Sequence, residues 1–142
     1  MSSMSPGLKN AIAIVVGLAV CMGLNGALVG AGSSLIPPPE GVDPNNLDSI
    51  KANIHRYGPQ HFVVPLVAHA AGSFVGAWIA AILAASRKRR IAMMIGIVHL
   101  IGGIVATYMI PAPVWFISAD LLFAYLPMAH LAARVAAPSD DS

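Results

Sequence analysis

Three ionisable side chains, His69, His99 and Asp120, occur in stretches that are otherwise apolar enough to lie in a membrane. A carboxylate at the centre of a membrane helix costs about 2.5–3.5 kcal/mol on insertion scales, so it requires a compensating partner. Imidazole exchanges a proton near neutral pH, and a neighbouring carboxylate favours its charged form. Two kinds of chemistry fit these residues: a path for protons or a small solute, or hydrogen bonds that hold helices together. Asn25 and Ser73 are further polar candidates for the same intramembrane pocket.

The composition is that of a membrane protein. Of the 142 residues, 57% are hydrophobic and only 10% are charged, whereas charged residues make up about 25% of an ordinary soluble domain. A membrane-spanning helix needs about 20 residues, and four apolar stretches have roughly this length. They cover residues 8–30, 62–85, 91–110 and 114–133. We therefore predict an all-α membrane protein, a bundle of four transmembrane helices with no soluble domain that could bind nucleic acid.

The distribution of basic residues predicts the orientation of this bundle. Six of the eight Lys and Arg side chains lie at span ends that share one side, and four of the six form the run Arg87–Arg90. The other two, Lys51 and Arg56, lie in the long loop 31–61. Because loops rich in basic residues stay in the cytoplasm, both termini are predicted to be cytoplasmic and the long loop to face outward. The tail 138–142 is expected to be disordered.

The outward loop carries the pattern of a short amphipathic helix. Asn45 or Asn46 can cap its first turn. Its apolar residues fall on one face, and they are Leu47, Ile50 and Ile54. Such a helix either rests on the membrane surface or packs on the protein, and the pattern leaves both possibilities open.

Small residues surround the histidine of the second span. On a helical projection, Gly72, Gly76 and Ala80 lie within about 60° of His69. The bulky residues of this span gather on the opposite side, and they are Val63, Val67, Phe74 and Trp78. Membrane helices pack through small residues because lipid supplies no hydrophobic drive between them. His69 is therefore predicted to face protein.

The third span repeats this design around His99, with Gly102 and Gly103 as predicted packing residues. The first span has its own small-residue stripe, formed by Gly23, Gly26, Ala27 and Gly30. Asn25 lies roughly 120° from that stripe, so the projection does not determine which way Asn25 points. An exposed stripe would offer a surface to a neighbouring subunit.

The fourth span supplies Asp120, at a depth that matches His69. We predict that Asp120 accepts a hydrogen bond from His69 or His99, so that the three line one polar pocket nearer the outer face. If Asp120 only holds helices together, its donor could instead be Tyr125, Tyr108 or a backbone group. Pro127 is expected to kink this span and to free the carbonyl of Phe123, because proline has no backbone N–H.

These features favour a non-enzymatic accessory or assembly protein, surrounded by lipid and forming a homo-oligomer or part of a larger membrane complex. The alternative is a proton or small-solute pathway lined by His69, His99 and Asp120. A third hypothesis is haem held by two histidines. The sequence contains no nucleophile elbow, phosphate-binding loop or zinc-protease motif, and it predicts no metal site. The single Cys21 excludes an internal disulfide and is expected to be a small buried residue.

Two segments, "LIPPPEGVDPNNLDSIKANIHRYGPQHFVVPLVAHAAGSFVGAWIAA" and "LIGGIVATYMIPAPVWFISADLLFAYLPMAHLA", resemble a group of small four-span bacterial inner-membrane proteins. The resemblance covers nearly the whole chain. It implies a four-span topology and a bacterial inner-membrane location. The group has no assigned activity, so the resemblance transfers no role to the intramembrane histidines or to Asp120.

Overall fold

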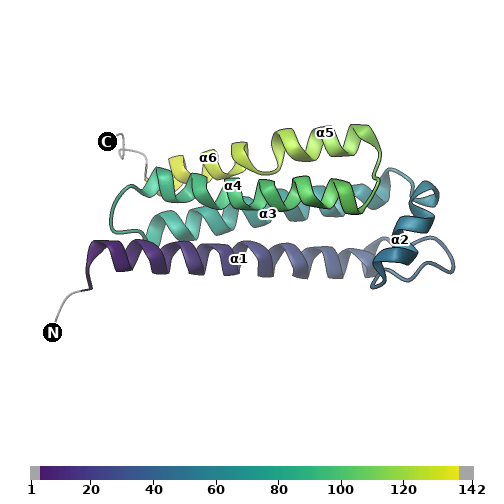
Figure 1. Cartoon of the computed structure of the whole chain (residues 1–142), viewed down its shortest axis with the longest axis horizontal. Coiled ribbons are helices and arrows are strands. Elements are labelled where there is room, and N and C mark those ends of the chain that lie inside the picture. The colour runs from purple at the N-terminus through teal and green to yellow at the C-terminus, as the bar shows by residue number, and fades with distance from the viewer. Residues whose placement is uncertain (1–3, 138–142) are drawn as a thin grey trace.

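A computed structural model describes residues 4–137, and this part of the chain is helical and without strands (Figure 1). Four spans are long and apolar enough to cross a membrane. The first three are α1 (Pro6–Leu35), α3 (Gln60–Leu83) and α4 (Lys88–Met109), and the fourth is divided into α5 (Val114–Phe123) and α6 (Leu126–Ala136). The long loop contains α2 (Leu47–Asn53) and the short 3-10 helix η1 (Ile54–Arg56).

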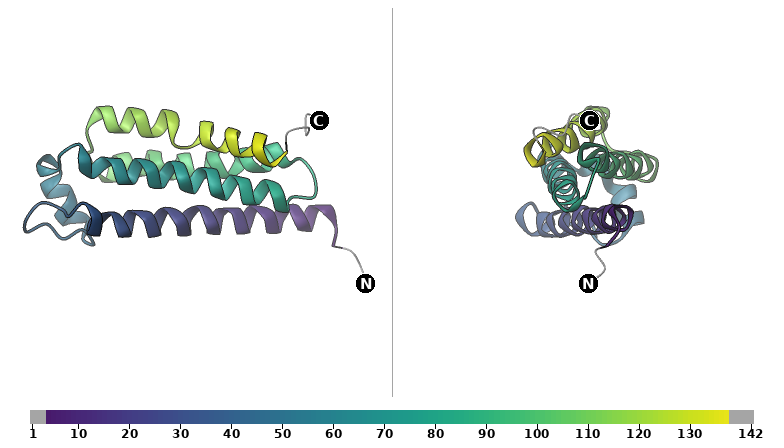
Figure 2. Two further views of the ribbon diagram at one scale, coloured as in Figure 1. Left: turned by 180° about the vertical axis from the view of Figure 1, so that it is seen from behind. Right: turned by 90° about the vertical axis from the view of Figure 1, so that its left-hand side faces the viewer.

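The spans run up and down in a bundle, with α1 along one side of the other three (Figure 2). The third helix, α3, is central and packs against α1, α4, α5 and α6. We call the end that carries α2 the loop end. The opposite end, where α1 begins and α6 finishes, is the termini end (Figure 1).

Close contact between α1 and α3 depends on glycine in both helices. Gly72, Gly76 and Ala80 of α3 are all buried. A Cβ added to Gly76 would lie 2.5 Å from the Cβ of Cys21 and 2.7 Å from the carbonyl oxygen of Gly17. The backbones of α1 and α3 are therefore closer together than any residue larger than glycine at position 76 would allow. This close approach gives extensive van der Waals contact, which holds the helices together where lipid supplies no hydrophobic drive.

The predicted stripe on α4 is only partly a packing surface. Gly103 is buried, and a Cβ there would collide with the Tyr125 hydroxyl. Gly102, in contrast, is exposed and a Cβ there would meet nothing within 4 Å, so its prediction as a packing residue is wrong. Within residues 4–137 no other helix lies against α4 at Gly102, whereas the next residue, Gly103, contacts Tyr125.

The opposite side of α3 also differs from the prediction. Val63 and Val67 are more than half exposed, as expected. Phe74 and Trp78 are partly buried and pack against the hydrophobic core instead of pointing away. The reason is that α6 covers the back of α3 at the termini end, so α3 has protein neighbours on several sides.

The first span is longer than its predicted range 8–30. Its 30 residues start after Ser5, whose side chain accepts a hydrogen bond from the backbone N–H of Leu8. After Pro6 in the first turn, the next proline is Pro37, which restricts Ile36 to the extended conformation in which the helix ends. The helix therefore continues past the predicted boundary and forms one wall of the loop end.

A break divides the fourth span, and it lies slightly before the proline that was expected to kink it. The first half ends at Phe123, and Pro127 occupies the first turn of α6, where its missing N–H removes no helical bond. Tyr125 stands at the break and is fully buried. The break turns its side chain into the bundle, toward Asp120 and α4.

Candidate binding site

The site is built around a hydrogen bond between His69 of α3 and Asp120 of α5. The Nδ1 atom of His69 lies 2.7 Å from Oδ1 of Asp120, so the predicted bond from Asp120 to a histidine is present. Tyr125 donates its hydroxyl proton to Oδ2 of Asp120 at 2.6 Å. Asp120 is only 4% exposed, and both of its oxygens have a donor, which is how a buried carboxylate is stabilised.

The proton positions follow from these contacts. The Tyr125 hydroxyl has one proton, which it donates in the hydrogen bond to Asp120. The hydroxyl oxygen of Tyr125 can therefore only accept from His69 Nδ1, which lies 3.0 Å away. With Asp120 ionised, His69 Nδ1 carries a proton and shares it between Asp120 and Tyr125. Every hydrogen bond of His69 within residues 4–137 uses Nδ1. Its Nε2 atom is left for a ligand, and the carboxylate fixes the tautomer and the ring orientation.

A second group of polar side chains continues from this one toward α1. The Nδ1 atom of His99 lies 2.8 Å from Ser73 Oγ and 3.2 Å from Cys21 Sγ. The rings of His99 and Tyr125 meet edge to face at a centroid distance of 5.0 Å. His69, His99, Asp120 and Ser73 therefore gather in one place.

Asn25 adjoins this group without joining its hydrogen bonds. Its Cβ faces Gly72 of α3, and its Oδ1 is buried with no donor in the described part of the chain. Asn25 thus points toward α3, which the projection did not determine. An added Cβ would meet nothing within 4 Å at the stripe residues Gly23, Gly26 and Gly30. Of these, Gly26 and Gly30 border a pocket at the loop end.

The sequence left Tyr125 as one of several possible donors to Asp120, and nothing in it indicated that Cys21 would contact His99. In an unbroken helix, positions five residues apart lie about 140° from each other, so Tyr125 would not face the same way as Asp120. Only the break between α5 and α6 brings their side chains together, and Pro127 was its one signal. Cys21 is fully buried as expected, but it also contacts the His99 ring.

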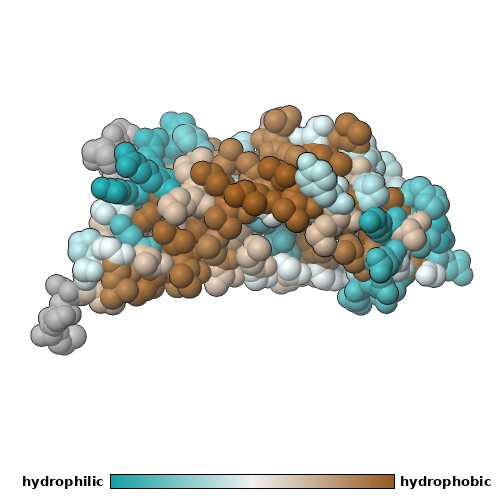
Figure 3. Space-filling model, in the orientation of Figure 1, coloured by the Kyte–Doolittle hydropathy of each residue, from teal (hydrophilic) through white to brown (hydrophobic). Residues whose placement is uncertain are grey.

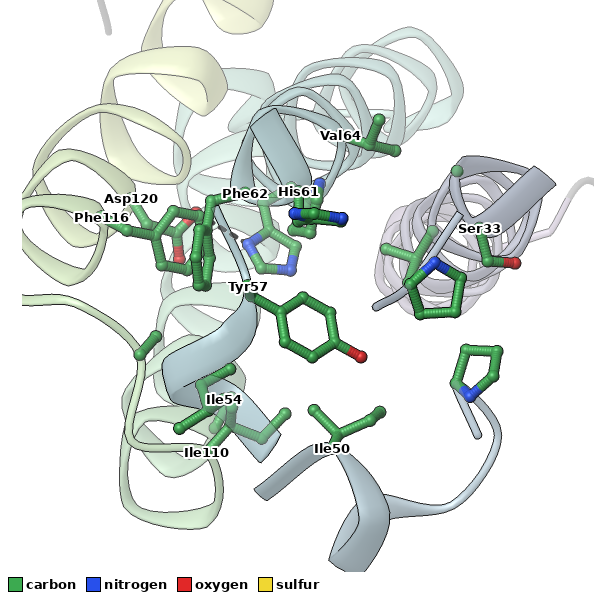
Figure 4. A pocket seen from close by; sticks show the side chains of 18 of the residues that line it. Ser33, Ile50, Ile54, Tyr57, His61, Phe62, Val64, Ile110, Phe116 and Asp120 are labelled. Atoms are coloured by element: carbon green, nitrogen blue, oxygen red, sulfur yellow. Dashed lines mark hydrogen bonds and ion pairs between the residues drawn. The ribbon is translucent and has the colours of Figure 1, made fainter. Parts of the chain in front are cut away.

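Beside the His69–Asp120 pair lies a pocket of about 470 Å³ at the loop end. This volume is in the range of small-molecule sites. Figure 4 shows its walls, which come from the end of α1, the long loop, α3, α4 and α5. The apolar lining residues include Val29, Ile36, Ile50, Ile54, Phe62, Val64, Ile110, Phe116 and Ile117. Ile50 and Ile54 of the loop helices thus face the pocket.

Few polar groups line this pocket, and none is Lys or Arg. His61 is fully engaged, because its Nδ1 accepts from Gly58 N–H and its Nε2 donates to the carbonyl of Pro37. Partial burial raises the pKa of the Tyr57 hydroxyl above its ordinary value, so this group stays neutral. The charged chemistry of the pocket is therefore concentrated at Asp120 and His69.

Toward the termini end the bundle is closed by small residues in contact. A Cβ on Gly17 would lie 2.6 Å from that of Ala80, and a Cβ on Gly96 would lie 2.6 Å from that of Ala129. None of the residues that line the pocket belongs to α6. The pocket therefore ends at the His69–Asp120 pair and does not continue through the bundle.

No protein-family model, curated protein or solved structure matches this chain. The function must therefore be argued from the geometry of the site.

The arrangement does not fit haem held by the two histidines. Their rings meet edge to face with centroids 5.9 Å apart, and Tyr125 contacts both. A porphyrin would have to lie between two imidazoles on opposite sides of one plane, and the packed rings leave no such gap. Within residues 4–137, no group of three His, Cys, Asp or Glu side chains is placed to hold a metal ion.

Proposed function

We propose that this chain is a non-enzymatic, multi-pass protein of the bacterial inner membrane that binds a small membrane-soluble molecule. One observation carries the proposal: an apolar pocket ends at an oriented histidine whose Nε2 has no hydrogen-bond partner among residues 4–137. Pockets with apolar walls and a few placed polar groups are the usual form of small-molecule sites. This modifies the solute-pathway hypothesis, because the closed termini end supports binding and not passage.

The positions of the hydroxyl and thiol groups argue against catalysis. Ser73 and Cys21 are fully buried behind His99, so a ligand in the pocket does not reach them. Ser33 and Thr107 line the pocket, but their hydroxyls donate to carbonyls of their own helices, at Gly30 and Ile104. None of these groups is hydrogen-bonded to a base that faces the pocket, which nucleophilic catalysis requires.

Entry from the lipid is favoured by the composition of the pocket rim. Gly26, Val29 and Gly30 of α1 face Ala106 and other residues of α4 across it. Figure 3 shows hydrophilic atoms recessed between the apolar surfaces of these two helices. A molecule dissolved in the bilayer could therefore slide between α1 and α4 and bring its polar group to His69.

Filling the pocket should abolish binding. In Ala106→Phe, a ring would occupy space at the rim, whereas in Val105→Phe the added ring points outward, because Val105 is 51% exposed. We expect photoreactive dodecyl probes with alcohol, acid and amine head groups to label pocket peptides of native protein saturably. Labelling should fall by about tenfold in Ala106→Phe and persist in Val105→Phe. Absence of saturable labelling by all three probes would refute the proposal.

The proposed orientation places the loop end, and hence the pocket, in the outer half of the membrane. It rests on the six basic residues at the termini end against two in the loop. A reporter fused after the last residue should be active in the cytoplasm, and one inserted at Asn45 should be active only outside it. The opposite pattern of activity would place the pocket on the cytoplasmic side.

A second role, as a subunit of a homo-oligomer or larger complex, is favoured by the exposed small-residue stripe of α1. The matching stripe of α3 is already used within the chain, so association would have to use α1. Ala27→Leu, on the exposed side of α1, should reduce the mass of the detergent-solubilised particle to that of one chain. A native protein that already has the mass of one chain would contradict this role.

A further inference from the structure

We infer that the ligand is a neutral membrane alcohol, with its hydroxyl on Nε2 of His69 and its hydrocarbon chain leaving between α1 and α4. This inference rests on the proposed function, because it names the class of molecule that the pocket would hold. Three features of the site carry it: the charge that the pocket already contains, the donor and acceptor properties of the free nitrogen, and the shape of the exit.

The charge already in the pocket disfavours ionised head groups. The carboxylate of Asp120 already accepts from His69 at 2.7 Å and from Tyr125 at 2.6 Å. A fatty acid would bring a second carboxylate toward the same imidazole, with no Lys or Arg in the pocket to compensate it. An amine would have to reach Asp120, which is only 4% exposed and already has a donor at each oxygen. Because an uncompensated charge is costly in an apolar site, a neutral head group binds best.

The protonation of His69 selects a hydroxyl among neutral groups. Nδ1 carries a proton in either state, so Nε2 is an acceptor when the ring is neutral and a donor when it is charged. A ketone or ether can only accept, and it therefore matches only the charged ring. A hydroxyl both donates and accepts. A hydroxyl therefore forms a hydrogen bond with Nε2 both when the His69 ring is neutral and when it is charged.

The exit suits a hydrocarbon chain. Gly26 and Gly30 of α1 have open space where a Cβ would lie, and Ala106 faces them from α4. These small residues leave a gap between apolar walls toward the bilayer. Of the other polar side chains along the walls, Ser33, Thr107 and His61 are bonded within the protein, so these three do not compete with His69 for the hydroxyl. Tyr57 and Asn45 line the pocket from the long loop.

Competition on the native protein tests this inference. A photoreactive dodecyl alcohol is bound in detergent micelles, and its labelling of pocket peptides is measured against unlabelled dodecan-1-ol, dodecanoate, dodecylammonium and dodecyl methyl ether. We expect dodecan-1-ol to displace half of the probe at a mole fraction about tenfold lower than that needed for each of the other three competitors. His69→Leu should lose saturable labelling, while His69→Gln, which retains a donor and an acceptor at the depth of Nε2, should keep most of it.

The outcomes separate this inference from the proposed function. If dodecanoate or dodecylammonium competes as well as the alcohol, the pocket binds a ligand but the neutral head group is wrong. If the methyl ether matches the alcohol, the requirement for a hydroxyl is wrong. If none of the photoreactive head groups gives saturable labelling, both the pocket's function and the ligand class fail.

Discussion

Gly76→Leu should be among the most destabilising single substitutions in this protein. Even the Cβ would lie 2.5 Å from Cys21 Cβ and 2.7 Å from the carbonyl of Gly17, and the rest of the leucine side chain has no space beyond them. Because the nearest atoms include helix backbone, α1 must move away from α3 to admit it. We expect a loss of about 3 kcal/mol, the upper end of the usual range for overpacking. Unfolding in mixed micelles, followed by circular dichroism, measures it.

Gly23→Leu is the matched control, because Gly23 lies on α1, one of the two helices that meet at Gly76, but outside their contact. Nothing lies within 4 Å of a Cβ at Gly23, and leucine is a better helix former than glycine by about 1 kcal/mol. The control should therefore be as stable as the native protein or slightly more so. Equal losses at Gly76 and Gly23 would mean that α1 and α3 do not pack through the glycines described above.

Helical periodicity predicted the packing surface of α3 because every residue of that stripe meets one straight neighbour, α1. The same reasoning was wrong for Gly102, since a projection treats a helix as evenly surrounded along its length. On α4, Tyr125 covers Gly103 but nothing in the described part of the chain covers the neighbouring Gly102, and no periodicity in the sequence of α4 indicates that. Phe74 and Trp78 were misplaced for a related reason, because a central helix has more than one buried side.

The hydrogen bond between His69 and Asp120 was predictable, because two ionisable groups at the same depth in a membrane bundle have few other partners. Tyr125 was one of several possible donors, and the sequence did not single it out, because its position depends on a break in the fourth span whose direction the proline does not specify. The pocket itself could not be predicted. Its walls combine four separate spans with Ile50, Ile54 and Tyr57 of the loop, and the folding of that loop over the bundle follows no short-range pattern.

Removing the carboxylate at Asp120 should also be severely destabilising, and a graded series can separate its two hydrogen bonds. In Asp120→Ala, the N–H of His69 and the hydroxyl of Tyr125 both lose their acceptor in a buried site. Breaking such a buried pair costs about 3–5 kcal/mol. In Asp120→Asn, the amide oxygen still accepts from His69 but the NH₂ group cannot accept from Tyr125. We expect this variant to lose about 1–3 kcal/mol, the cost of one unsatisfied buried group.

Tyr125→Phe completes the series, because it removes the hydroxyl alone and leaves the bond from His69 to Asp120 intact. It should cost about 1 kcal/mol and preserve binding of the dodecyl alcohol, since Asp120 still fixes the proton on Nδ1. Asp120→Asn should weaken that binding, because an amide holds the imidazole less firmly than a carboxylate does. The measurements are unfolding in mixed micelles and probe labelling of the same samples. A contrary result would be a free energy of unfolding of Asp120→Ala within about 0.5 kcal/mol of the native value, the range of an ordinary surface substitution. Water or lipid head groups would then bond to His69 and Tyr125 in place of the carboxylate. The site would then lie open to solvent instead of forming the buried floor of a pocket.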